Sequence, residues 1–292
     1  MTKTTEKSSV KGNRLLEIWK QFKRNKGAMI GLVVLIILIL IAVFADVIWD
    51  YEADIIAMQV SERLVKPCLA HPFGTDNYGR DMLARIGYGT RYSLLLGFFS
   101  VLIGVMIGVP LGAIAGYVGG RFDNILMRMV DTFTIIPSLL MTIILVAVLG
   151  TSLLNLIIAL AISTIPVMTR ITRASVMVTR NNDYIESARA VGAPAPVIVM
   201  KHVLPNCFSP ILVQATLRVG TSIISAAGLS YIGLGVPIPT PEWGALLSSS
   251  KSFIINAQHM CLFPGLAIMI TVMVINLVGD GLRDALDPKL KR

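Results

Sequence analysis

Long apolar segments alternate with shorter polar ones along the whole chain, and this pattern predicts the fold. Residues 27–45, 92–120 and 132–169 carry no charge. A helix needs about 20 mainly apolar residues to cross the hydrocarbon core of a bilayer. The third segment is about twice that length, and Gly150-Thr151-Ser152 divides it into two helices, at about 128–149 and 153–171. Apolar segments at 208–231 and 260–279 bring the predicted spans to six.

These segments predict an all-α, polytopic membrane protein. We expect a cytoplasmic amino-terminal segment at 1–27, a first transmembrane helix at 28–48 and an extracytoplasmic segment at 49–92. A five-helix core at 93–281 and a cytoplasmic tail at 282–292 complete the chain. A signal peptide is the alternative for the first apolar segment. That segment is too long for one, and no small-x-small cleavage site follows it.

Composition and charge agree with a membrane protein. With 54% hydrophobic residues, 15% charged residues and a mean hydropathy of +0.73, the chain is not an ordinary soluble domain. The net charge of +9 raises the question of nucleic acid. If the amino end is cytoplasmic, however, the inner segments hold 19 Lys and Arg and the outer segments hold 6. The positive-inside rule therefore predicts cytoplasmic termini, explains the basic excess and leaves no reason to expect nucleic acid binding.

A long polar segment at 181–206 interrupts the apolar pattern between the fourth and fifth predicted spans. Asp183 is suited to cap a short helix, and Glu186 follows at the spacing of a capping box. Gly192, closely followed by Pro194, predicts that this helix ends after about two turns. The segment therefore begins with a helix too short to be stable alone, so something must pack against it.

A second short helix is predicted within the same segment. Pro196 suits its first turn, and Pro205 is expected to end it. The first helix carries the small side chains Ser187 and Ala188 beside Tyr184. Small residues allow a backbone to lie deep in the groove of a partner. The residues themselves leave two interpretations open, an ordinary cytosolic loop and a docking element.

The second predicted span and its approach carry two further signals. Residues 81–88 are compatible with a surface helix, or with a solvated loop that folds against its own face. Within the span, glycines recur every four residues, at Gly104, Gly108, Gly112 and Gly116. Small residues at this spacing form a groove along one helix face and allow close helix contact. We interpret this groove as ordinary packing inside the membrane.

Motifs for enzyme chemistry are missing from the sequence. No Gly-Lys dipeptide occurs, so the chain has no phosphate-binding P-loop, and no serine-hydrolase, Cys-x-x-Cys or His-Glu-x-x-His motif is found. The three histidines are scattered, and the three cysteines show no metal-type spacing, although a bridge between Cys68 and Cys261 stays open. We therefore predict a protein that is not an enzyme and that itself binds no cofactor or metal.

Two ionisable residues lie in or near predicted spans. Arg218 is about ten residues into the fifth span, roughly 15 Å deep at 1.5 Å per residue. A charge at that depth is costly and marks either a functional group that faces a water-filled cavity or an ion pair with another helix. Asp131 lies one turn beyond Arg128, near the inner interface, and is expected to be structural.

The polar segment resembles the coupling-loop motif in the membrane subunits of bacterial ABC importers. The similarity consists of Glu186-Ser187-Ala188, then Gly192, Ile198 and Leu204-Pro205, with Ser187 where the family usually has alanine. Other stretches, among them FGTDNYGRDMLARIGYGTRYSL, GLSYIGLGVPIPTPEWG and NLVGDGLRDALDPKL, are similar to the C-type permease of dipeptide and oligopeptide importers. Together these matches cover nearly the full chain.

The resemblance implies a type I ABC importer transmembrane fold in the bacterial inner membrane. It implies that the chain pairs with a second homologous permease and docks ATPase subunits, which bind ATP and Mg²⁺, and that an extracytoplasmic peptide-binding protein delivers the substrate. The implied coupling residues are Tyr184, Glu186, Ser187, Ala188, Gly192, Ile198, Leu204 and Pro205. Nickel and glutathione permeases share much of the pattern, so those solutes are alternatives to peptides. A different class, a secondary carrier that needs no ATP, would place ionisable groups near the midplane, where Arg218 is the one deep candidate.

Overall fold

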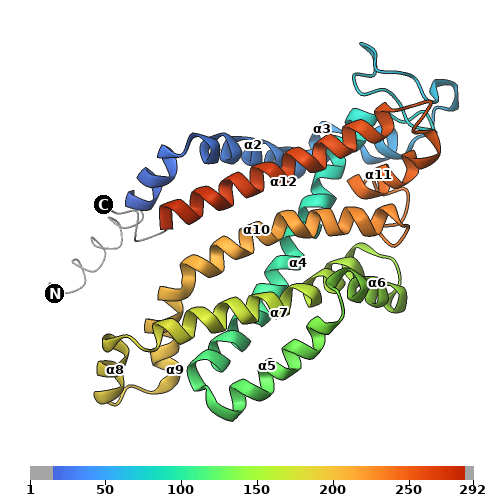
Figure 1. Cartoon of the computed structure of the whole chain (residues 1–292). Coiled ribbons are helices and arrows are strands. Elements are labelled where there is room, and N and C mark those ends of the chain that lie inside the picture. Colours follow the sequence, from blue (N-terminus) through green and yellow to red (C-terminus); the bar gives the residue numbers. More distant parts are fainter. Residues whose placement is uncertain (1–15, 287–292) are drawn as a thin grey trace.

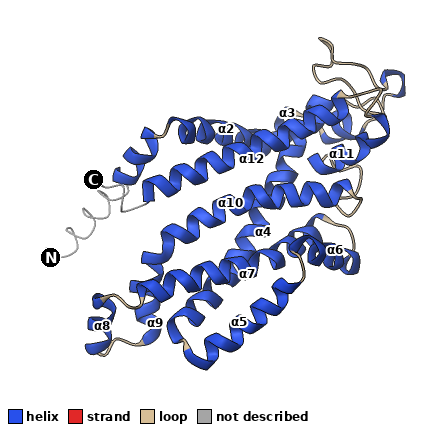
Figure 2. Ribbon diagram, in the orientation of Figure 1, coloured by secondary structure: helices blue, strands red, loops and turns tan. Residues whose placement is uncertain are grey.

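The computed structural model describes residues 16–286, and over this range the chain is built from helices joined by loops (Figures 1 and 2). The long helices are α2 (Lys26–Val43), α4 (Met82–Val118), α5 (Gly120–Ile135), α6 (Ser138–Leu149), α7 (Leu153–Thr179), α10 (Leu204–Tyr231) and α12 (His259–Leu286). The short ones are α3 (Ala45–Ile48), α8 (Asp183–Ala190), α9 (Ala195–Ile198) and α11 (Trp243–Ser250), with π-helical segments at Tyr51–Ile56 and Val199–Val203 and 3-10 turns at Val60–Glu62 and Lys251–Phe253. The predicted all-α class is confirmed.

Five helices among the described residues are long and apolar enough to cross a membrane. They are α2, α4, α7, α12 and the continuous helical stretch from Ala195 to Tyr231 that contains α10. A sixth span requires α5 and α6 to be counted together, although they meet at 81°. The predicted number of six spans therefore corresponds to five unbroken helices and one broken one.

The prediction of one helix over 128–149 is wrong, because the chain bends between α5 and α6. Ile136 leaves the helical region with φ −80° and ψ 124°, and Pro137 follows it. A proline ring disfavours the helical conformation of the residue before it and removes one backbone donor. The helix on the amino-terminal side also begins earlier than predicted, at Gly120.

The second span begins earlier than the sequence predicted. Residues 81–88 are neither a surface helix nor a loop, since α4 starts at Met82 and continues for 37 residues. Asp81 caps it by accepting a hydrogen bond from the amide of Ala84 at 2.9 Å. Met82 and Tyr88 are buried in this first part of the helix, because the loops at this end of the protein cover it.

The glycine groove of α4 holds α7. At all four glycines a Cβ atom would approach α7 closer than side chains tolerate, at 2.8 Å from the carbonyl oxygen of Ile165 for Gly108 and 2.3 Å from that of Thr169 for Gly112. The two helices therefore touch along their backbones, which is the close contact that the spacing predicted. Figure 1 shows α4 passing behind α7. From this contact α4 continues to the end of the molecule where α3 lies.

We expect Gly112→Ala to destabilise the protein. The new methyl group meets a backbone carbonyl, which cannot move aside, so α4 and α7 must separate at a cost of about 1–3 kcal/mol. Gly228→Ala in α10 is the matched control, because a Cβ there meets nothing within 4 Å. Thermal unfolding in detergent should show a lower Tm for the first variant and an equal or higher Tm for the second. Equal Tm values for both variants would argue against close packing at Gly112.

Two loop regions join to cover one end of the bundle; we call residues 49–81 and 232–258 together the loop cap. Asp76 lies at its centre, where it accepts hydrogen bonds from Arg80 Nε at 2.7 Å and Arg85 Nη1 at 2.6 Å. Arg85 also donates to the carbonyl of Pro239 at 3.2 Å, which connects the two regions. All three charged side chains are buried, and the single carboxylate between two guanidinium groups leaves the cluster with a net charge of +1.

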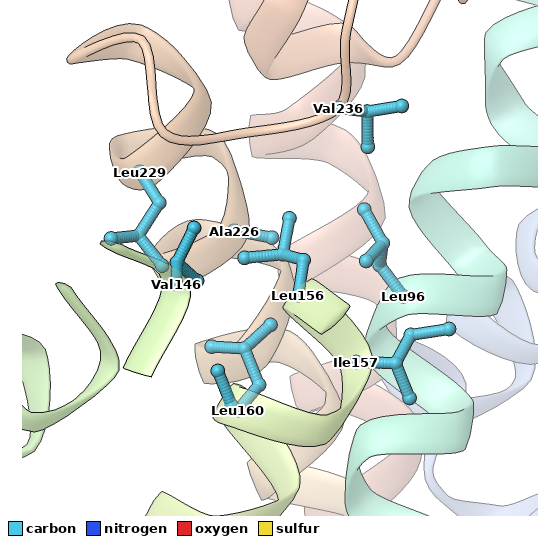
Figure 3. Packing of buried hydrophobic residues seen from close by; sticks show 9 residues of the cluster. Leu96, Val146, Leu156, Ile157, Leu160, Ala226, Leu229 and Val236 are labelled. Atoms are coloured by element: carbon cyan, nitrogen blue, oxygen red, sulfur yellow. The ribbon is translucent and has the colours of Figure 1, made fainter. Parts of the chain in front are cut away.

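A hydrophobic cluster fixes the helices directly beneath the loop cap (Figure 3). It brings together one residue of α4, one of α6, four of α7, two of α10 and one of the loop that follows α10: Leu96, Val146, Leu156, Ile157, Ala159, Leu160, Ala226, Leu229 and Val236. The side chains of Leu156, Leu160 and Val146 point toward one another between the ribbons in this view. This end of the bundle is therefore held by apolar packing that involves four helices.

Candidate functional site

The segment formed by α8 and α9 lies at the end of the bundle opposite the loop cap (Figure 1). α7 leads into it and α10 leads out of it, and the carboxyl end of α12 is found toward the same end. Both predicted short helices are present, so this prediction is confirmed.

The end of α8 follows the sequence prediction closely. Gly192 adopts φ +82°, a conformation that glycine reaches without strain. Its amide donates to the carbonyl of Arg189 at 2.9 Å, and the amide of Ala193 donates to the carbonyl of Ala188 at 3.1 Å. These two bonds form a Schellman motif, which satisfies the last carbonyls of the helix.

The other predicted boundaries of this segment are wrong in detail. Asn182, rather than Asp183, occupies the position before α8, and no side chain caps the helix. Pro196 lies in the first turn of α9 as predicted. Pro205 does not end a helix; it lies in the first turn of α10. The chain passes from α9 to α10 through the π-helical segment Val199–Val203, so the second short helix is continuous with a span.

Burial divides the predicted coupling residues into two sets. Ile198 is 1% exposed and packs with buried residues of α4, α7 and α10, and Ala188 and Leu204 pack against the same cluster. Ile185, which the motif did not single out, is fully buried in it as well. The other set is exposed and comprises Tyr184, Glu186, Ser187, Gly192 and Pro205. The structure therefore brings all eight residues together, but Ile198 attaches the segment to the bundle and is not available to a partner. The motif spacing alone does not distinguish these two roles.

Contacts with the end of α4 strengthen this attachment, and sequence reasoning missed them. Arg180 Nη1 donates to the carbonyl of Gly116 at 2.7 Å, and the guanidinium of Arg189 lies 5.1 Å from the ring centroid of Tyr117. Because these partners are more than sixty residues apart in the chain, no local pattern indicates them. The α8 segment is therefore in contact with α4, α7 and α10.

Arg218 lies beside a second candidate site, a cavity of about 230 Å³ between α5, α6, α7 and α10. The cavity opens at the bend between α5 and α6, and its wall includes the polar residues Thr134, Ser138 and Ser163. Arg218 is partly buried, and no described carboxylate forms an ion pair with it. Asp131 instead binds Arg170, with Oδ1 and Nη2 2.7 Å apart, and so connects α5 with α7. The ion-pair alternative for Arg218 therefore finds no support within this subunit.

The scattered histidines and cysteines form no metal site among the described residues. His71 lies in the loop cap between Asp81 and Glu62, whose carboxylates raise its pKa, with the hydrogen bond to Asp81 as the main cause. His259 is hydrogen-bonded to the carbonyl of Thr75 at 2.9 Å. Cys68 and Cys261 are both free thiols, so the bridge left open between them is not formed.

Comparison with known proteins agrees with this architecture. Residues 108–292 match the family "Binding-protein-dependent transport system inner membrane component", and residues 14–67 match the "N-terminal TM domain of oligopeptide transport permease C". In solved structures the chain is similar to the inward-facing MetNI methionine ABC transporter, with a TM-score of 0.60 and 21% identity over 70% of this chain and 98% of that chain. That similarity supports the type I importer fold.

Two curated relatives are much closer in sequence. The dipeptide transport system permease protein DppC of Alkalihalophilus pseudofirmus is 46% identical over 94% of this chain and 90% of its own length. The glutathione transport system permease protein GsiD of Escherichia coli is 45% identical over the same shares. The chain therefore belongs to the family of binding-protein-dependent transport system inner membrane components and is a membrane-spanning permease subunit of an ABC importer.

Proposed function

We propose that this chain forms half of the translocation path of an ATP-driven importer for dipeptides or oligopeptides. The observation that carries the proposal is the 46% identity to a dipeptide permease over 94% of the chain. Glutathione is the second candidate, because a glutathione permease is 45% identical over the same share. Both solutes carry free carboxylates and amide groups, so both suit a cavity that combines one cation with hydroxyl groups.

ATP hydrolysis is assigned to separate ATPase subunits, which bind ATP and Mg²⁺ and dock on α8. Support comes from the exposed residues Tyr184, Glu186 and Ser187, which a partner can reach, and from the buried Ile185, which anchors the same helix. A second homologous permease completes the path, and an extracytoplasmic peptide-binding protein delivers the solute to the loop cap. Closure of the ATPases would then shift α8 and reorient the attached spans. An ATP-independent carrier does not suit a member of this family.

The orientation is part of this proposal: both termini and α8 face the cytoplasm, and the loop cap faces outward. It is supported by the excess of Lys and Arg in the segments on the α8 side. Native Cys68 is exposed in the loop cap, and Ser187 is exposed on α8. In a first variant, Cys207 and Cys261 are replaced by serine, and an impermeant thiol reagent added outside the cell should label Cys68. In a second variant, all three native cysteines are replaced by serine and Ser187→Cys is added. This variant should stay unlabelled until the membrane is opened. The reverse pattern would remove the basis for ATPase docking on α8.

Reconstituted transport tests the function itself. The chain would be inserted into liposomes with its homologous permease, its ATPases and its binding protein, and uptake of labelled dipeptides, longer peptides, glutathione and nickel would be compared. We expect peptide uptake that needs both ATP and the binding protein. Uptake of glutathione alone would select the second candidate, and uptake without ATP would reject the importer mechanism. Vesicles that lack only the ATPases serve as the matched control.

A further inference from the structure

Four helices surround an apolar groove that neither candidate site uses. α2 packs against α12, α12 against α10, α10 against α4, and α4 against α2, so the four form a ring. The space between them measures about 760 Å³ and is lined by all four helices. Figure 1 shows α2, α12 and α10 running side by side, with α4 crossing behind them. This groove lies within the spanning helices and away from the Arg218 cavity.

The lining of the groove is suited to hydrocarbon. Its wall is mainly aliphatic and aromatic and includes Leu35 and Ile39 of α2, Phe98 and Leu102 of α4, and Leu212 of α10. The hydroxyl of Thr216, also in the wall, already donates to the carbonyl of Leu212 at 3.0 Å. Away from Arg91 at one end, the wall offers no free polar group to bind water, so the occupant of this part must be apolar.

One end of the groove carries a cation. Arg91 lies there and donates through Nη1 to Asp46 at 2.7 Å, just beyond the end of α2. This ion pair leaves other guanidinium donors available, and the Arg91 side chain is 31% exposed. Asp46 also accepts a hydrogen bond from Tyr88, so it is shared between two donors. Guanidinium donors of this kind bind phosphate oxygens well.

The dimensions discriminate between possible occupants. From Arg91 to Val105 the groove follows α4 for about 21 Å at 1.5 Å per residue, which exceeds the roughly 15 Å depth of one hydrocarbon leaflet. A spanning helix about 10 Å wide and 30 Å long occupies on the order of 2,400 Å³, more than the atom-free space of about 1,690 Å³ in the groove. An extended hydrocarbon chain is narrow enough to enter the groove, whereas a whole partner helix is too large to be enclosed by it.

We propose that this groove binds one acyl chain of an anionic phospholipid, with the headgroup phosphate beside Arg91. The lipid belongs to the leaflet next to residues 49–81. It fills the space enclosed by α2, α4, α10 and α12, and thereby supports the first span on the side that faces the groove. The proposal is independent of which solute the importer carries.

Photolabelling of the complete transporter in nanodiscs tests this site. Phosphatidylglycerol with a diazirine on its acyl chain would be activated by light, and the labelled peptides would be mapped by mass spectrometry. We expect adducts on the groove-facing residues of α4 and α10, and at least about fivefold weaker labelling there with phosphatidylcholine of the same chain length. Labelling spread evenly over all lipid-facing helices would overturn the site.

Two variants of α4 provide a matched pair. Leu102→Trp narrows the groove and should reduce its labelling severalfold, whereas Met106→Trp, one turn along and exposed outside the lining, should leave it unchanged. If Leu102→Trp does not assemble, Leu212→Phe narrows the groove from α10. Arg91→Gln should remove the preference for phosphatidylglycerol over phosphatidylcholine. Unchanged labelling in the narrowed groove, or a crosslink from Phe98 to the second permease instead of lipid, would refute the proposal.

Discussion

Replacing Gly192 by valine is expected to abolish most ATP-driven uptake while the protein still folds in the membrane. Gly192 ends α8 with φ +82°, and a side chain with a Cβ adopts this region at a cost of about 1–2 kcal/mol, more if it is β-branched. An added Cβ meets nothing within 4 Å, so the cost arises from the backbone and not from packing. We expect this strain to be released by loss of the Schellman motif, which displaces α8.

The measurement compares uptake with co-purification of the ATPases. Because about 1.4 kcal/mol is a factor of ten in an equilibrium, we expect roughly a tenfold loss in both. Gly192→Asn is the matched control, since asparagine tolerates the left-handed region and should retain most of the activity. Normal uptake and normal ATPase binding in Gly192→Val would show that the end of α8 plays no part in coupling.

Arg218→Ala is expected to reduce uptake of peptides with a free carboxyl terminus while the complex still assembles. Arg218 faces a cavity and has no described carboxylate partner, so its removal breaks no ion pair within the subunit. A guanidinium can bind a carboxylate through two parallel hydrogen bonds, and bonds to charged groups contribute about 1.5–3 kcal/mol each. Loss of one such contact corresponds to a reduction in uptake of about tenfold or more.

Peptides that differ only at the carboxyl terminus make this test specific. Uptake of C-terminally amidated peptides should fall less in Arg218→Ala than uptake of free peptides. Arg218→Lys preserves the charge but loses the planar fork, so it should restore uptake only partly. Equal losses for both peptide types together with poor assembly would instead assign Arg218 a structural role at the contact with another subunit.

The coupling segment shows how far local sequence information extends. The length of α8 and its end at Gly192 were predictable, because glycine at a positive φ and a following proline act over a few residues. The division between the exposed Glu186 and the buried Ile198 was not predictable from the motif. Burial depends on which helices surround the segment, and those helices are distant in the chain.

The Arg218 cavity illustrates the same limit. The sequence alone placed the charge of Arg218 within a span, because the apolar segment around it sets its depth in the membrane. The free-energy cost of a charge follows from that depth. The cavity beside it exists because α5 and α6 meet at 81°, next to Pro137. A proline within an apolar segment can be accommodated in a helix or can break it, and only the packing against α7 and α10 selects between these outcomes.

The sequence by itself therefore determined the class, the number of apolar spans and the close contact along the α4 glycines, because hydropathy and residue size are properties of each segment. Tertiary structure alone decided that residues 81–88 begin a long helix, that Asp76, Arg80 and Arg85 are buried together, and that four helices enclose an apolar groove. Each of these features requires the loop cap or distant helices to exclude water and lipid from groups that a local pattern places at the surface.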